Sequence, residues 1–330
     1  MNAILSLIAV IGLVLIPLIG VKGANLHFLF GIVVPYVAII IFLFGVISRV
    51  MKWGRTPVPF CIPTTCGQQK SLPWIKQSKL DNPSTTSGVV GRMLLEVLLF
   101  RSLFSNTKFE LREGPKLAYG STKWLWLGGL AFHWAFLVVL IRHLRLFTEP
   151  VPAFLMGVEA LDGFLQVGIP GVLISGIVLL LAVTYLFLRR VFIPQVRYIS
   201  LAADYFPLFL IMSIAVTGIL MRYFLRVDLV SIKALTIGLV SFNTKVPEGI
   251  SVIFYIHLLL VSTLIAYIPY SKIMHLGGVL LSPTRNLPND SRMVRHINPW
   301  NYPVKVHTYE EYENDFRDKM KNAGLPVEKE

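Results

Sequence analysis

Long apolar runs alternate with short polar segments along most of the chain. A helix needs about 20 apolar residues to cross a bilayer. Six runs reach or approach that length: 3–20, 25–48, 124–147, 163–188, 203–226 and 250–274. These runs are continuously apolar, whereas the strands of a membrane barrel alternate between apolar and polar residues. The pattern predicts an all-α integral membrane protein with six transmembrane helices.

The polar segments divide the chain into four parts. We expect an N-terminal transmembrane hairpin over 1–48, a large loop over 49–122, a four-helix region over 123–281 and a polar tail over 282–330. Within the large loop, residues 88–104 place apolar and charged side chains on opposite helical faces, which predicts an amphipathic helix. Such a helix lies in the membrane interface or packs against a partner, and the sequence leaves both possibilities open.

Composition supports the membrane assignment. The chain is 55% hydrophobic and 15% charged, with a mean hydropathy of +0.66, whereas soluble domains carry about 25% charged residues. The first apolar run lacks a basic leader and a convincing small-residue cleavage site, so we interpret it as a retained helix rather than a signal peptide.

The distribution of the basic residues explains the net charge of +13 without nucleic acid. Eleven Lys and Arg residues lie in 49–122, three in 189–200 and nine from Lys272 onward, all in segments that alternate topology places on one side. Because positive loops stay cytoplasmic, both termini are expected in the cytoplasm and the chain in the cell membrane.

The chain has two cysteines, Cys61 and Cys66, both in the large loop. Iron–sulfur clusters usually need four cysteine ligands. We therefore expect two structural thiols, kept reduced in the cytoplasm, and no cluster of its own in this chain.

Four histidines in two of the apolar runs are the main candidates for chemistry: His133, His143, His257 and His275. Ionisable residues inside a bilayer are costly unless they are paired or bind a ligand. The two runs have opposite directions, so His133 is expected beside His275 near the inner surface and His143 beside His257 near the outer surface. Each pair of neutral imidazoles suits the axial positions of one haem iron, which predicts two haems b.

The spacings agree only in part. His133 and His143 are ten residues apart, about 15 Å along a helix, whereas the eighteen residues from His257 to His275 span about 27 Å. Helix tilt, ligand rotamers and a kink at Pro269 together would absorb part of the difference. The other explanation is that the helix ends before His275, and the sequence leaves the two open. The alternative explanation is that such histidines bond to neighbouring backbone or side-chain groups. His27, at the outer turn, and His296 and His307, in the polar tail, are expected to be ordinary surface residues.

Arg142 and Arg145 flank His143 and have two possible roles. They bind haem propionates, which need cationic partners when partly buried, or they extend from the helix end toward water. The nearby carboxylates Glu149, Glu159 and Asp162 are expected to face water. The segments around them, 148–162 and later 227–249, are expected to be irregular loops.

These residues resemble those of a known family. The pattern HW-x8-H from His133 to His143, and H-x17-H from His257 to His275, are similar to the haem b (gamma) subunit of respiratory nitrate reductase and to the membrane subunit of heterodisulfide reductase. The sequences of residues 57–80 and 92–128 resemble most strongly the cytochrome b membrane subunit (the M subunit) of DsrMKJOP complexes of sulfur and sulfate metabolism. This last resemblance covers most of the chain.

The resemblance implies a five-helix cytochrome b bundle, formed by the second to sixth helices, with two bis-histidine haems b. It implies electron exchange with menaquinone near the outer haem. A cytoplasmic iron–sulfur subunit related to heterodisulfide reductase would dock beneath the inner haem and act on the sulfur carrier protein DsrC. A periplasmic c-type cytochrome and a second membrane subunit would complete the complex.

One residue departs from the nitrate reductase pattern. A lysine that serves the quinol site there has no counterpart here, because no lysine occurs between Lys123 and Lys233. Quinol contacts therefore do not transfer. A membrane subunit of heterodisulfide or nitrate reductase is the alternative within this class. A proton-relaying transporter and a structural anchor are the alternatives outside it.

Overall fold

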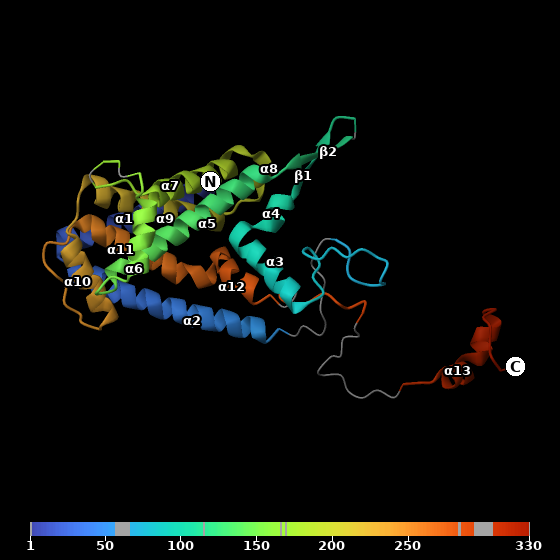
Figure 1. Ribbon diagram of the computed structural model, residues 1–330. Helices are drawn as coiled ribbons and strands as arrows, with labels where there is room; N and C mark the ends of the chain where they lie inside the picture. Colours follow the sequence, from blue (N-terminus) through green and yellow to red (C-terminus); the bar gives the residue numbers. More distant parts are fainter. Residues whose placement is uncertain are drawn as a thin grey trace.

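Six long apolar helices form the body of the protein in a computed structural model (Figure 1). The structure describes residues 2–56, 67–114, 116–165, 167–168, 170–282, 285–293 and 306–329. The candidate spans are α1 (Asn2–Ala24), η1–α2 (Leu29–Gly54), α5–η2 (Lys123–Leu146), α7 (Ile174–Phe192), α9–η3 (Ala202–Phe224) and α11–η4 (Val252–Tyr270). The predicted fold class, an all-α membrane protein with six spanning helices, is confirmed. Cys61, Cys66 and His296 lie outside the described residues.

The spans form an open arc. α5 packs along α7, α7 along α9 and α9 along α11, while α2 packs on the other side of α11. α5 and α11 make no extensive backbone contact in the described part of the chain. The bundle has two ends in Figure 1: β1, β2, α3 and α8 lie at one, named here the hairpin end, and α6 and α10 lie at the other, the α10 end.

The first helix is part of this bundle. α1 packs against both α9 and α11, and its Val10, 2% exposed, lies in one core cluster with Leu210 and Leu260. The Ser6 hydroxyl donates to the carbonyl of Ala202 at 2.8 Å. A polar side chain buried in a span is stabilised by such a bond.

Glycines permit two close approaches between helices. A Cβ on Gly128 of α5 would lie 2.4 Å from Tyr185 of α7, and one on Gly45 of α2 would lie 2.7 Å from Pro269 of η4. Small residues let membrane helices approach closely, because packing rather than the hydrophobic effect drives their association.

The structure corrects the start of one predicted span and the character of two predicted loops. The fourth span begins at Ile174 rather than at 163, because Gly163, Gly168 and Pro170 interrupt the apolar run. The segments predicted to be irregular contain the short helices α6 (Ala153–Asp162) and α10 (Leu229–Val240). α10 is capped by the Asp228 side chain, which accepts from the backbone N–H of Val230 at 2.9 Å. Ile232 and Leu235 of α10 are buried in a second core cluster with Tyr255, whereas Val230 and Val240 of the same helix are exposed.

The large loop differs from the prediction as well. The single helix expected over 88–104 is divided into α3 (Thr86–Leu99) and α4 (Arg101–Ser105), because Phe100 adopts a left-handed conformation with φ of 50°. An antiparallel hairpin, β1 (Thr107–Arg112) with β2 (Lys116–Ser121), follows. The hairpin is a small exception to the all-α prediction.

α3 is joined to α5. The indole N–H of Trp134 donates to the carbonyl of Leu98 at 3.0 Å, and that of Trp126 to the carbonyl of Leu99 at 2.7 Å. These bonds satisfy carbonyls that the end of a helix leaves without partners. Apolar side chains of α3, such as Val90 and Leu94, remain exposed, so docking to a membrane surface or to a partner stays a prediction.

Further contacts fix the loop and the tail. The Arg101 guanidinium bonds to the Asp81 carboxylate and holds the pKa of that group below its ordinary value of 3.8. The remaining helices are α8 (Pro194–Ile199), α12 (His275–Leu280) and α13 (Tyr309–Asn322). Thr308 and Glu311 form a capping box at the start of α13.

Candidate functional site: two histidine pairs

α5 carries two of the four candidate histidines on one uninterrupted helix. The Nδ1 atom of His133 lies 2.7 Å from the carbonyl oxygen of Gly129, and that of His143 lies 2.7 Å from the carbonyl oxygen of Val139. Each ring therefore bonds to the backbone one turn earlier. A proton held on Nδ1 leaves Nε2 as the nitrogen available to a metal.

A break in the chain positions the fourth histidine. α11 ends at Tyr267, a short 3-10 turn follows over Ile268–Tyr270, and Ser271 is extended with φ of −116°. His275 then begins the new helix α12. Because Pro269 and the extended Ser271 end the straight helix, His275 does not lie five regular turns beyond His257. The discrepancy between the two spacings is resolved by the second of the two predicted explanations.

The structure brings together the histidines that the sequence paired. The ring centroids of His133 and His275 are 5.9 Å apart, with an interplanar angle of 83°. Those of His143 and His257 are 6.4 Å apart and nearly parallel, at 15°. The first pair is nearer the hairpin end than the second, because His133 lies midway along α5, which follows β2, whereas His143 is the last residue of α5.

These separations fit one iron between each two rings. A metal–imidazole bond is about 2 Å long and the ring centroid lies roughly 1 Å behind the nitrogen, so two axial imidazoles have centroids roughly 6 Å apart. In the described part of the chain, no Nε2 atom of the four histidines makes a hydrogen bond. His133 and His275 are also exposed, although α5 belongs to a membrane bundle. All four rings are thus oriented, and those of His133 and His275 are accessible.

The donor set favours a haem over a bare metal ion. Among the described residues, no group of three or more His, Cys, Asp or Glu side chains is placed to bind a metal. A zinc site needs three or four protein ligands. A haem already supplies four nitrogens to its iron, so two histidines complete the coordination. Haem therefore fits the residues present.

The His143/His257 pair has a partner that the sequence did not indicate. Nδ1 of His257 lies 2.8 Å from the hydroxyl oxygen of Thr217, a buried residue on α9. The neighbouring Gly218 leaves room for the same ring, because a Cβ there would lie 3.5 Å from His257 Cε1. Thr217 is 40 positions from His257 in the sequence, and no local pattern reveals the contact.

The His133/His275 pair is supported by an ion pair. Nδ1 of His275 lies 3.0 Å from the carbonyl oxygen of Lys272, whose ammonium group donates to Asp204 at 2.6 Å. Asp204 is 7% exposed and also accepts from the backbone N–H of Leu201, where it caps α9. This network connects the segment that carries His275 to the start of α9.

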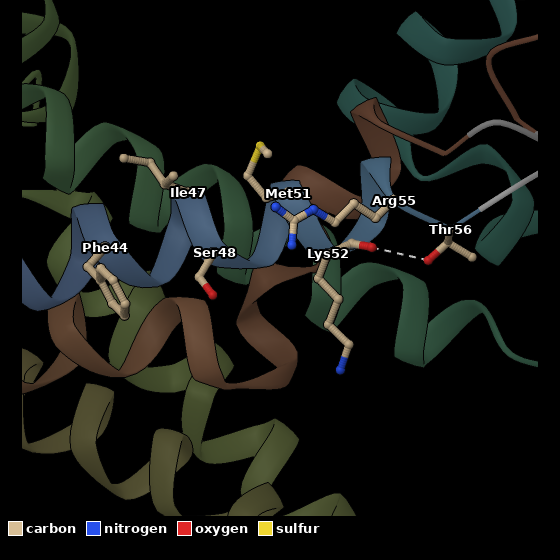
Figure 2. Close-up of a pocket in the computed structure, with 7 residues that line it drawn as sticks. All are labelled: Phe44, Ile47, Ser48, Met51, Lys52, Arg55 and Thr56. Atoms are coloured by element: carbon tan, nitrogen blue, oxygen red, sulfur yellow. Dashed lines mark hydrogen bonds between the residues drawn. The ribbon is translucent and has the colours of Figure 1, made fainter.

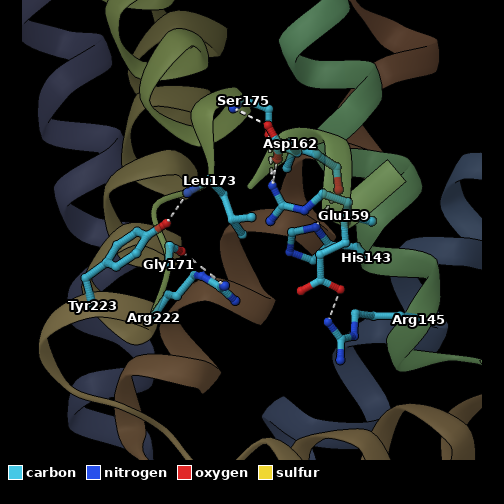
Figure 3. A network of polar contacts seen from close by, with 11 residues as sticks. His143, Arg145, Glu159, Asp162, Gly171, Leu173, Ser175, Arg222 and Tyr223 are labelled. Atoms are coloured by element: carbon cyan, nitrogen blue, oxygen red, sulfur yellow. Dashed lines mark hydrogen bonds and ion pairs between the residues drawn. The ribbon is translucent and has the colours of Figure 1, made fainter. Parts of the chain in front are cut away.

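The two candidate arginines are already bonded to carboxylates (Figure 3). Arg142 forms an ion pair with Asp162 and donates to the hydroxyl of Ser175 at 2.9 Å, and Arg145 forms an ion pair with Glu159. The prediction that Asp162 faces water is wrong. Asp162 is 9% exposed and accepts from both the backbone N–H and the hydroxyl of Ser175.

The other predicted residues have various surroundings. Glu149 pairs with Lys233. His307 is exposed, as expected, and lies near Glu311. His27 is partly exposed, and its ring lies edge-on to that of Tyr255 with the centroids 5.3 Å apart.

A cavity of 490 Å³ lies elsewhere, along the C-terminal half of α2 (Figure 2). Its described lining consists of Phe44, Ile47, Ser48, Met51, Lys52, Arg55 and Thr56. These residues include no histidine, and the cavity is not part of the candidate site.

Comparison with known protein families points to the part of the chain that carries the four histidines. The family model of the nitrate reductase gamma subunit matches residues 114–296. That range is more than half of the chain and contains all four paired histidines. The chain belongs to the nitrate reductase gamma subunit family.

The curated relatives match about three quarters or more of the chain. The "Hdr-like menaquinol oxidoreductase cytochrome b-like subunit" of Archaeoglobus fulgidus is 46% identical over 279 residues, covering 82% of this chain and 83% of the relative. The protein of the same name from Archaeoglobus profundus is 44% identical over 273 residues, with 81% of each covered. One subunit of the dihydromethanophenazine:CoB–CoM heterodisulfide reductase of Methanosarcina barkeri is 22% identical, covering 76% of this chain and 88% of its own. The resemblance to the gamma subunit family is confirmed, and the finer one to the M subunit of DsrMKJOP complexes stays a prediction.

Proposed function

We propose that the chain is a di-haem b membrane subunit that carries electrons between menaquinol and an iron–sulfur partner protein. The observation that carries this proposal is the presence of two histidine pairs, with centroids 5.9 and 6.4 Å apart, at two depths of one helix bundle. When bound, each haem supplies a one-electron carrier.

The protein's own residues perform three tasks in this proposal. The carbonyl oxygens of Gly129, Val139 and Lys272, with the Thr217 hydroxyl, keep each imidazole in the tautomer that presents Nε2. Such second-layer bonds set the orientation and basicity of a ligand. The apolar core around α9 and α11 excludes water. The break at Ser271 places His275 at the depth of His133.

The names of the relatives support menaquinol as the electron donor, because two relatives above 40% identity are cytochrome b-like subunits of menaquinol oxidoreductases. We place the quinol near the His143/His257 pair and the soluble partner at the hairpin end. The basic segments at that end favour the cytoplasm as its compartment.

The identity of the partner is the most specific part of the proposal. The large loop resembles in sequence the M subunit of DsrMKJOP complexes. This resemblance supports, as partner, an iron–sulfur subunit of the heterodisulfide reductase type that acts on DsrC. A periplasmic c-type cytochrome and a second membrane subunit would belong to the same complex. The likeness to a heterodisulfide reductase subunit supports the second candidate, a heterodisulfide reductase complex. Copurification of the native complex, followed by identification of its subunits, distinguishes the two.

The electron-transfer role is tested by quinol reduction of the haems. When a menaquinol analogue is mixed with the purified complex, the spectrum of reduced haem b should appear. His143→Ala should abolish this reduction. A haem-containing complex that the analogue does not reduce would contradict menaquinol as donor. A complex without haem b absorbance would support the proton-relaying transporter instead.

A further inference from the structure

Arg222 is a cation in a membrane span without a carboxylate partner among the residues that the structure describes. It lies in η3 (Leu220–Phe224), the last turn of the span that begins at Ala202. Its Nε atom is buried and has no hydrogen-bond partner. Its guanidinium makes one long bond, 3.4 Å from Nη2 to the carbonyl of Gly171, and lies 5.7 Å from the ring centroid of Tyr223. An arginine in this environment is costly unless an anion neutralises it.

Neighbouring arginines at the same end differ from Arg222. Arg142 and Arg145 each form an ion pair with a carboxylate, Asp162 and Glu159 respectively. In the described part of the chain, no carboxylate lies within ion-pair distance of Arg222. The adjacent Tyr223 is also satisfied, because its hydroxyl accepts from the backbone N–H of Leu173 at 2.8 Å (Figure 3).

The position of Arg222 relates it to the outer histidine pair. Gly218 faces the ring of His257, since a Cβ on that glycine would lie 3.5 Å from His257 Cε1. Arg222 is four residues later, in the π-helical turn η3, and therefore lies about one turn closer to the α10 end. Figure 3 shows its side chain and that of His143 in one view of this region.

We propose that Arg222 binds a carboxylate group of the cofactor held by His143 and His257, a propionate of the outer haem. This inference rests on the proposed function, because it requires that haem. Nε and Nη1 make no hydrogen bond in the described part of the chain, and two adjacent guanidinium N–H groups match a carboxylate bidentately. Arg142 and Arg145, the arginines that the sequence favoured, are used to fix α6 to the bundle.

The test is a redox titration of both haems in the purified complex, with the outer haem identified as the one missing from His257→Ala. A nearby cation favours the reduced haem, which carries one positive charge fewer. Arg222→Gln should therefore shift the midpoint potential of the outer haem to lower values and leave the inner haem unchanged. Arg222→Lys, which keeps the charge, should shift it less. Lys245→Gln removes an exposed cation at the same end and should shift neither haem.

Three results would overturn the inference. Arg222→Gln leaves the outer potential at the wild-type value; it shifts both haems equally; or it raises only the KM for a menaquinol analogue, which would assign Arg222 to the quinol. If Arg222→Gln fails to assemble, Arg222→Lys alone decides, because an unchanged potential and an unchanged outer-haem content in that variant exclude a bidentate carboxylate bond. A wild-type complex without haem would instead refute the proposed function.

Discussion

The hydroxyl oxygen of Thr217 on α9 lies 2.8 Å from Nδ1 of His257 on α11. The same oxygen lies 2.8 Å from the carbonyl of Ser213, one turn earlier in α9. The Thr217 hydroxyl can donate its single proton to that carbonyl and accept the Nδ1 proton of His257. Nδ1 of each of the other three histidines bonds to a carbonyl of its own segment. Only His257 among the four depends on a side chain from another helix.

Thr217→Val should weaken the outer haem site selectively. Valine keeps the shape of threonine but leaves the buried N–H of His257 unsatisfied, at a cost of about 1–3 kcal/mol. Loss of a second-layer bond typically reduces metal affinity about 10- to 100-fold. Haem quantification and redox titration of the purified variant should show reduced content or an altered potential for one haem. Thr217→Ser keeps the hydroxyl and should resemble the wild type; equal loss in both variants would contradict the role of this bond.

Lys272→Met should affect the inner haem instead. The substitution removes the ammonium group that joins the segment before His275 to Asp204. Because the Lys272 carbonyl orients His275, we expect a broadened or shifted inner-haem potential with the outer haem unchanged. Lys272→Arg keeps the charge and is the matched control. A variant with two unaltered potentials would show that the ion pair has no positioning role.

Gly45→Leu should remove the inner haem by displacing the turn before His275. Even a Cβ at this position would lie 2.7 Å from Pro269 and 2.9 Å from Tyr270. Overpacking of this kind costs typically about 1–3 kcal/mol. Spectra should show about half of the wild-type haem. Gly54→Leu is the control on the same helix, since nothing lies within 4 Å of a Cβ there, and equal haem loss in both variants would argue against the specific contact.

Asp162→Asn should destabilise the α10 end of the bundle. Breaking a buried ion pair leaves an uncompensated charge, here Arg142, and typically costs about 3–5 kcal/mol. The thermal unfolding temperature in detergent should fall clearly. The double variant Arg142→Met/Asp162→Asn should recover part of the loss, because no lone charge then remains buried. A double variant less stable than the single one would exclude this explanation.

The sequence predicted the spans because bilayer crossing demands long apolar runs, and these are visible without tertiary information. It failed where a short apolar helix ends in a polar turn, as in α6 and α10, and where Phe100 takes a left-handed conformation that no local residue demands. The hairpin after α4 was missed because its strands are short and partly charged. Their cross-strand contacts, such as Phe109 against Tyr119, become evident only in three dimensions.

The histidine pairs were predictable for a different reason. Antiparallel spans match residues by depth, so four histidines in two spans can be sorted without a structure. Their supporting residues were not predictable, since Thr217 is 40 positions from His257 and Asp204 is 68 from Lys272. Arg222 was overlooked because Arg142 and Arg145 lie closer to His143 in the sequence. Only the structure reveals that these two arginines already form ion pairs with carboxylates.

The number of haems per chain tests the central claim most directly. Extraction of haem from the purified wild-type complex, measured against the amount of this chain, should give two haems b. His133→Ala and His257→Ala should each reduce that number by one, and each should remove a different component of the redox titration. A wild-type value of zero, or loss of the same component in both variants, would contradict the account.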